Sequence, residues 1–117
     1  MHTAGYNPYI DQSCFDREMR KIFSSMWVYG CTWPEIEPEG SFVVVNAPFG
    51  EVIITTNSGQ PKAFFNKCLH RGHRLTDVCH GQTSSFVCPY HGWQYDRSGK
   101  LENIPGAVKF YGKEAVN

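Results

Sequence analysis

Two short segments of the chain each combine a cysteine with a histidine. Cys68 and His70 have one residue between them in NKCLHRGHRL, and Cys88 and His91 have two residues between them in CPYHGW. Seventeen residues separate the first pair from the second. Thiolates and imidazoles are ligands for a limited set of metals. We therefore expect both segments to contribute to a single metal centre.

The four side chains are open to three interpretations. A structural zinc ion accepts two cysteines and two histidines, but zinc sites usually group cysteine with cysteine and histidine with histidine along the chain. Here each segment supplies one ligand of each kind, which suits a Rieske [2Fe–2S] centre, where two cysteines bind one iron and two histidines bind the other. The third interpretation is that the four residues bind no metal.

The glycines near these pairs favour the two-iron interpretation. Gly72 follows the first pair and Gly92 follows the second, each within two residues of the histidine. Glycine permits tight loop turns and a close approach of the backbone. Backbone N–H groups can then point at the sulfides of a cluster and stabilise their negative charge.

The rest of the sequence predicts the elements that must position these segments. Runs of β-branched and aromatic residues, bounded by turn-forming residues, predict short strands at residues 27–31, 41–46, 51–56, 62–66, 85–88 and 93–96. Many short strands with a single helix indicate a mainly β, antiparallel sandwich or barrel. Both Cys/His pairs follow strands, so we expect them in two loops that project from the sheets and converge.

One helix is expected before the strands. Apolar side chains share a helical face at the following positions: Phe15, Met19, Ile22, Phe23 and Met26. Ser13, with Asp16 three residues later, resembles a capping box. We therefore predict a helix over about residues 14–26. Residues 34–40, PEIEPEG, predict a proline-broken loop.

Length and composition fit one modest domain. The chain has 117 residues, of which 41% are hydrophobic, enough to fill one core. Eleven basic residues balance eleven acidic ones, which argues against a nucleic-acid-binding domain. No apolar segment has the length of a signal peptide core or a membrane span, so we expect a cytoplasmic protein. Thiols stay reduced there, and five cysteines fit a disulfide framework poorly.

The motif CLHRGH…CPYHGW resembles the Rieske motif C-x-H-x-G…C-P-x-H-G-W. Over about residues 13–106 the chain is similar to the N-terminal Rieske domain of the alpha (oxygenase) subunit of aromatic-ring-hydroxylating Rieske non-heme iron oxygenases. The segments that carry this similarity are EMRKIFSSMWVYG, PEGSFVVV, FFNKCLHRGHRL, FVCPYHGWQYDRSGKL and NIPG. The resemblance implies a Rieske [2Fe–2S] cluster with Cys68, His70, Cys88 and His91 as ligands.

The resemblance also implies an oxidoreductase component with defined redox partners. Such a domain receives electrons from a ferredoxin or flavin reductase and passes them to a mononuclear iron, which two histidines and a carboxylate hold in a second domain. The other histidines here are His2, His73 and His80, which suggest no such triad. We therefore expect a single Rieske domain over residues 1–117, with its core at about 27–106, that carries electrons only. A free-standing Rieske ferredoxin is the alternative, and a zinc-stabilised binding module is a third.

Respiratory Rieske proteins differ from this chain at three loop positions. They have an additional cysteine in each loop, joined by a disulfide, and a serine hydroxyl that donates to the cluster. The corresponding residues here are His73, Tyr90 and Trp93. We therefore expect no disulfide between the loops, no hydroxyl donor and a reduction potential at the low end of about −150 to +300 mV. For Tyr90 and Trp93, both a cover over the cluster and packing in the core remain open.

Overall fold

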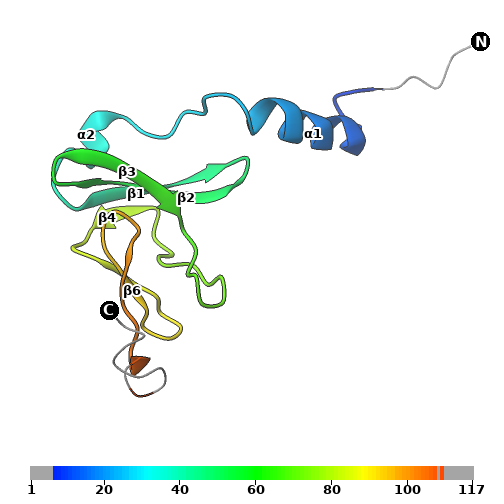
Figure 1. Cartoon of the computed structure of the whole chain (residues 1–117). Helices are drawn as coiled ribbons and strands as arrows, with labels where there is room; N and C mark the ends of the chain where they lie inside the picture. Colours follow the sequence, from blue (N-terminus) through cyan, green and yellow to red (C-terminus); the bar gives the residue numbers. More distant parts are fainter. Residues whose placement is uncertain (1–6, 108, 110–117) are drawn as a thin grey trace, which may run out of the picture.

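The computed structural model describes residues 7–107 and 109, and in this part of the chain two antiparallel sheets follow a helical segment (Figure 1). The four-stranded sheet has the order β3-β2-β1-β4 and consists of β1 (Ser41–Ala47), β2 (Gly50–Asn57), β3 (Gln60–Phe65) and β4 (His80–Gln82). The three-stranded sheet has the order β5-β6-β7 and consists of β5 (Phe86–Val87), β6 (Gln94–Tyr95) and β7 (Leu101–Asn103). The predicted mainly β, antiparallel architecture is confirmed.

Tight turns fix the register of the larger sheet. Strands β1 and β2 pair from Phe42 opposite Thr55 to Ala47 opposite Gly50. Strands β2 and β3 are joined through Ser58 and Gly59, whose φ angles are 53° and 70°. Positive φ at both central residues gives the turn a twist that matches the flanking strands. The turn-forming residues of NSGQP thus set which side chains of β2 face the core.

A shared core lies between the two sheets and extends to the cysteines. Its buried members are Phe42, Ile53, Cys68, Leu75, Phe86, Cys88 and Tyr95. The Phe86 ring meets Phe42 and Phe64 edge to face, with centroids 5.2 and 5.4 Å apart. Each buried apolar side chain of this size stabilises the fold by about 1.5–3 kcal/mol. Packing of the sheets therefore also positions both sulfur atoms.

The N-terminal helix begins and ends earlier than predicted. It consists of α1 (Gln12–Glu18) followed by one π-helical turn, η1 (Met19–Phe23). The cap is Asp11, whose carboxylate accepts a hydrogen bond from the Cys14 N–H at 2.9 Å, so the prediction of Ser13 as the cap was wrong. The hydroxyl of Ser25 donates to the Lys21 carbonyl at 2.8 Å. Such a bond competes with helix continuation.

Two further predictions at the level of elements were wrong, and two strands were not predicted. Residues 27–31 form an extended connection with no partner strand among the described residues. Part of the predicted loop at 34–40 is a short helix, α2 (Trp33–Ile36), which the Thr32 and Glu35 side chains cap reciprocally. Strands β4 and β7 were missed. No helix in the described part of the chain is long and apolar enough to cross a membrane.

Candidate metal centre

The two loops that carry the Cys/His pairs have the same pattern of backbone hydrogen bonds. The first loop, residues 67–74, follows β3, and the second loop, residues 88–93, connects β5 to β6. The Cys68 N–H donates to the His73 carbonyl at 2.7 Å, and the Cys88 N–H donates to the Trp93 carbonyl at 2.8 Å. In both loops the cysteine N–H therefore bonds to the carbonyl five residues later, although the histidines are spaced differently.

In each loop, a glycine four residues after the cysteine forms a second backbone hydrogen bond that closes the turn. The N–H groups of Gly72 and Gly92 donate to the carbonyls of Cys68 and Cys88, both at 2.9 Å. Their φ angles are 71° and 72°, in the left-handed region that side chains disfavour. A Cβ atom at Gly92 would also lie 3.1 Å from the Pro105 ring. Each loop therefore needs glycine four residues after its cysteine.

The buried amide of Asn66 holds the first loop closed at its base. Its oxygen accepts from the backbone N–H groups of Leu75 at 2.9 Å and Thr76 at 3.1 Å. Its nitrogen donates to the Thr76 carbonyl at 2.8 Å and to the Glu51 carboxylate at 3.1 Å. One side chain at the start of the loop thus fixes the residues that end it.

The sulfur atoms of the two pairs lie on the inner side of the loops. Cys68 and Cys88 are each only 2% exposed. The Tyr95 hydroxyl lies 3.2 Å from the Cys68 sulfur and accepts a hydrogen bond from the Leu69 N–H at 2.9 Å. Because Tyr95 is itself buried, its hydroxyl is fixed against the sulfur by the core.

The phenol can supply the proton of this contact. Burial and the hydrogen bond with Cys68 raise the pKa of Tyr95 to about 12, so its hydroxyl stays protonated and can donate to a Cys68 thiolate. Burial also raises the pKa of the Cys68 thiol, but hydrogen bonds from Tyr95, the His70 backbone and Cys88 outweigh it and hold that pKa below its ordinary value. The thiolate is the form in which cysteine binds metal.

The two histidines lie on the outer side of the loops. The His70 and His91 rings meet at an edge-to-face angle of 64°, with centroids 4.6 Å apart. Both side chains are exposed. Partial desolvation lowers the pKa of His91, and the charges of His70, Arg71 and His73 lower it further. A neutral imidazole is the form that binds metal.

The four predicted residues therefore come together sorted by type, thiols inside and imidazoles outside. No three His, Cys, Asp or Glu side chains among the described residues converge on one point suited to a metal ion. A Rieske centre requires only two protein ligands at each of its two irons, with the cysteines on one and the histidines on the other. The arrangement of these side chains fits that group.

The remaining candidate residues lie in different places. His80 is in β4, opposite Val43 of β1, and its ring nitrogen is 3.4 Å from the Cys79 sulfur. His73 is an exposed residue of the first loop. His2 lies outside the described residues. Sequence reasoning missed the roles of Asn66 and Tyr95, because both act through contacts between distant segments.

Comparison with known proteins decides the family. The Rieske [2Fe-2S] domain matches residues 26–112, which is most of the chain. The chain belongs to the Rieske [2Fe–2S] domain family. Its cofactor is accordingly a Rieske-type [2Fe–2S] cluster, in agreement with the donor set described above.

Several oxygenase components resemble this Rieske domain. The large oxygenase component of the naphthalene 1,2-dioxygenase system of Pseudomonas putida is 35% identical over 108 residues, which are 92% of this chain and 24% of that protein. The N,N-dimethyl phenylurea N-demethylase subunit alpha of Sphingobium sp. (strain YBL2) is 38% identical over 106 residues, which are 87% of this chain and 22% of that protein. The chain thus spans about a quarter of the length of these relatives.

Solved structures give the same fold. Naphthalene 1,2-dioxygenase with indole bound in the active site matches with a TM-score of 0.85 and 34% sequence identity, over 90% of this chain and 24% of that one. The enzyme of the same name from Rhodococcus sp. matches with a TM-score of 0.82 and 33% identity, over 89% of this chain and 24% of that one. The architecture described above is therefore that of a Rieske domain.

Proposed function

We propose that this chain transfers electrons with Cys68, His70, Cys88 and His91 as the ligands of its Rieske cluster. When bound, the cluster accepts and releases single electrons. Cys68 and Cys88 would hold one iron as thiolates inside the core, and His70 and His91 would hold the other at the exposed end. The core of this domain would extend over about residues 27–106.

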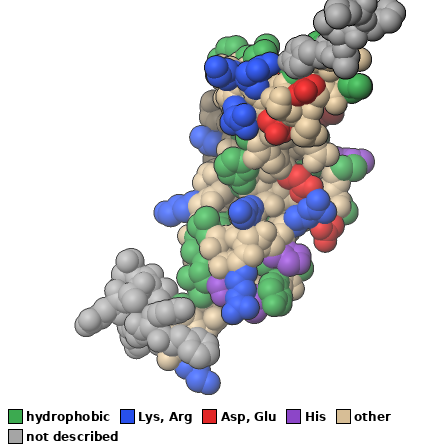
Figure 2. Space-filling model, turned by 90° about the vertical axis from the view of Figure 1, so that its right-hand side faces the viewer, with side chains coloured by type: hydrophobic (Ala, Val, Ile, Leu, Met, Phe, Trp, Pro, Cys, Tyr) green, Lys and Arg blue, Asp and Glu red, His purple; other side chains and the backbone are tan. Residues whose placement is uncertain are grey.

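One observation carries this proposal, the sorting of the ligand types between the inner and outer sides of the loops. The buried thiols are shielded from water, and the exposed imidazole edges offer a short route for an electron to a partner protein. On the face shown in Figure 2, histidine side chains gather with lysine or arginine side chains toward the lower end of the molecule. The Tyr95 hydroxyl and the closed loops then hold the thiolates in fixed positions.

The similarity to large oxygenase components supports a more specific role. We propose that the chain acts as the Rieske domain of a ring-hydroxylating oxygenase alpha subunit. It would receive electrons from a ferredoxin or a flavin reductase and pass them to a mononuclear iron. The relatives named above do not favour the alternative of a free-standing Rieske ferredoxin, because they are subunits of oxygenases and demethylases.

Metal analysis with matched variants tests the ligand set. The purified protein should contain about two iron and two acid-labile sulfide per chain. Cys68→Ser, His70→Ala, Cys88→Ser and His91→Ala should each lose this content, because the altered loop no longer binds the metal. Cys79→Ser and His80→Ala, which change the same residue types outside the loops, should retain it. Stoichiometric zinc in a colourless native protein would refute the proposal.

A further inference from the structure

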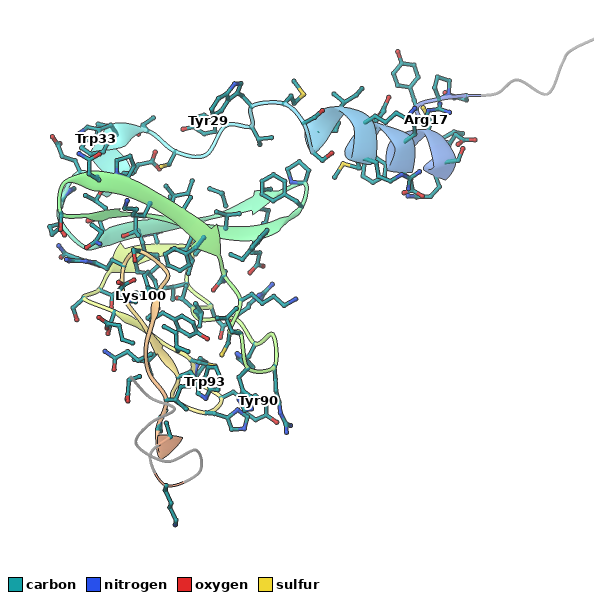
Figure 3. The ribbon with its side chains drawn as sticks, viewed as in Figure 1. Arg17, Tyr29, Trp33, Tyr90, Trp93 and Lys100 are labelled. Carbon is teal, nitrogen blue, oxygen red and sulfur yellow. The ribbon has the colours of Figure 1, made fainter. Side chains whose placement is uncertain are left out.

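Besides the contact between the two histidine rings, two further ring contacts join the first loop to the second. The Trp93 indole stacks on the His70 ring, with centroids 4.9 Å apart and planes only 6° from parallel. The Tyr90 ring lies 5.7 Å from the His73 ring at an angle of 47°. In each pair one ring comes from residues 67–74 and the other from residues 88–93. We name these two pairs the aromatic clasp (Figure 3).

The backbone of each loop is closed on itself rather than on the other loop. The hydrogen bonds from Cys68 to His73 and from Cys88 to Trp93 both stay within one loop. All cysteines are free, so no disulfide joins the loops. On the inner side, Tyr95 and the core hold the loops together. On the outer side, the clasp and the contact between the two histidine rings remain.

Trp93 is anchored where His70 is not. The indole is only partly exposed and packs against the core, and its backbone carbonyl accepts from Cys88. His70 is exposed, and the aromatic rings that meet its ring in the described structure are Trp93, in a parallel stack, and His91, edge to face. A parallel stack on a fixed indole restricts rotation of the imidazole. Trp93 can therefore fix the orientation of the His70 ring in the first loop relative to the second loop.

We propose that Trp93 and Tyr90 clasp the two loops together and that Trp93 is a positioning residue for His70. The clasp takes the place of a covalent link between the loops and holds His70 in one orientation before metal binds. The contact between the loops does not depend on a bound metal. The positioning of His70 as a metal ligand rests on the proposed function.

The first experiment measures opening of the loops in cluster-free protein. Iodoacetamide alkylates a buried thiol only when the structure around it opens, and peptide mass analysis separates Cys68 from Cys88. Trp93→Leu keeps apolar bulk but removes the ring, and Tyr90→Leu does the same for the second pair. Each should speed alkylation of both cysteines about two- to tenfold, the effect of losing one aromatic pair. Trp93→Phe and Tyr90→Phe should stay close to the parent protein.

Trp33→Leu is the matched control for this experiment. Trp33 is a half-exposed tryptophan of α2 at the far end of the molecule from Trp93 (Figure 3). Its replacement should leave the alkylation rates of Cys68 and Cys88 unchanged. Equal rates in Trp93→Leu, Tyr90→Leu and the parent would overturn the clasp, whether or not the parent binds a cluster.

The second experiment reports on His70 itself. Pulsed EPR of the reduced, cluster-loaded protein resolves the couplings of the histidine nitrogens that bind iron. In Trp93→Leu one nitrogen coupling should shift or broaden while the other stays, and Trp93→Phe should restore the parent spectrum. Loss of the cluster in Trp93→Leu with retention in Trp93→Phe also supports the role of the ring.

Two outcomes of the second experiment would overturn the positioning role. One is an unchanged pair of couplings in a cluster-loaded Trp93→Leu protein. The other is loss of the cluster in both variants, which would show that only the bulk of tryptophan matters. A parent protein without any cluster would instead refute the proposed function, and the alkylation rates would still decide whether the clasp exists.

Discussion

The Tyr95 hydroxyl lies against the Cys68 sulfur and can donate a hydrogen bond to it, which the sequence did not predict. A serine hydroxyl donor was not expected, because Trp93 stands at the corresponding position. The structure brings a different hydroxyl to the site, 3.2 Å from the Cys68 sulfur and protonated at neutral pH. A donor to a ligand sulfur stabilises the reduced, more negative cluster and raises its potential. Trp93 leaves no serine hydroxyl at the corresponding position, and a hydrogen bond donated by the Tyr95 hydroxyl would raise the potential above the value expected without any donor.

Replacement of Tyr95 by phenylalanine tests the effect of this donor. We expect Tyr95→Phe to lower the reduction potential by about 60 mV, equivalent to roughly 1.4 kcal/mol for one electron. The ring stays in the core, so the content of iron should not change. Voltammetry measures the shift, with Tyr29→Phe as the control because Tyr29 is exposed and lies away from Tyr90 and Trp93 of the second loop (Figure 3). A potential equal to that of the parent would show that the hydroxyl does not act on the sulfur.

At the residue scale the sequence predicts four candidate ligands but not the contacts that support them. The types and spacing of Cys68, His70, Cys88 and His91 indicate a metal centre, and their assignment as cluster ligands stays a prediction. The contact of Tyr95 with Cys68 spans 27 positions and exists only because β6 packs beneath the first loop. No local pattern carries such information, which explains why the donor was missed.

At the element scale the two loops are held at their bases in different ways. The second loop continues from the β5–β6 ladder, in which Val87 pairs with Gln94. The first loop follows β3 but does not return to a neighbouring strand at once. There the Asn66 amide supplies the missing pairing through its bonds to Leu75 and Thr76. The Asn66 amide thus closes the base of the first loop, and the pairing of Val87 with Gln94 closes the base of the second.

Removal of this amide should loosen one loop only. Asn66→Ala leaves the N–H groups of Leu75 and Thr76 without their acceptor, and we expect it to lower the free energy of unfolding by about 2–3 kcal/mol. Alkylation of Cys68 should accelerate more than alkylation of Cys88. Asn103→Ala, on exposed β7, is the control. Equal acceleration at both cysteines would contradict a local role for Asn66.

The turn between β6 and β7 predicts a dependence on pH. Burial raises the pKa of Asp96, but hydrogen bonds from Ser98 and Lys100 outweigh it and hold this pKa below its ordinary value. The ionised carboxylate therefore stabilises the fold above about pH 4, and this contribution is lost as pH falls through the lowered pKa. Asp96→Asn should destabilise the protein at pH 7 and much less at pH 2–3. Chemical denaturation at the two pH values measures this, and an equal deficit at both would contradict the role of the charge.

Strands were predicted well where sequence and pairing agree and poorly where they do not. The three long strands have β-branched runs and turns that match their register. Residues 27–31 have the same local character, but no strand pairs with them in the described structure. Strand β4 contains His80, Gly81 and Gln82, which have no strand signal, and exists because it pairs with β1. Tertiary pairing therefore overrides local propensity in both directions.

At the scale of the whole molecule, the N-terminal helix stands apart from the sheets (Figure 1). Apolar side chains along it and the following connection are exposed, among them Phe15, Ile22, Phe23, Met26 and Trp27. The chain comes close to the sheets at Gly30, where a Cβ atom would lie only 2.5 Å from the Ile54 side chain. The folded body therefore begins near Gly30, and the helix contributes little to its core.

Deletion of residues 1–25 should accordingly leave the body intact and reduce association. We expect the shortened protein to keep its iron content and to melt within about 2 °C of the parent. The parent should bind more of a hydrophobic dye and self-associate more at high concentration, because an exposed apolar surface of this extent favours contacts. Ile22→Ser with Phe23→Ser should reproduce the reduced association, whereas Arg20→Ser on the same helix should not. A shortened protein that lost its cluster or unfolded would show instead that the helix is part of the folded body, since the sheets and loops would then depend on contacts that it makes.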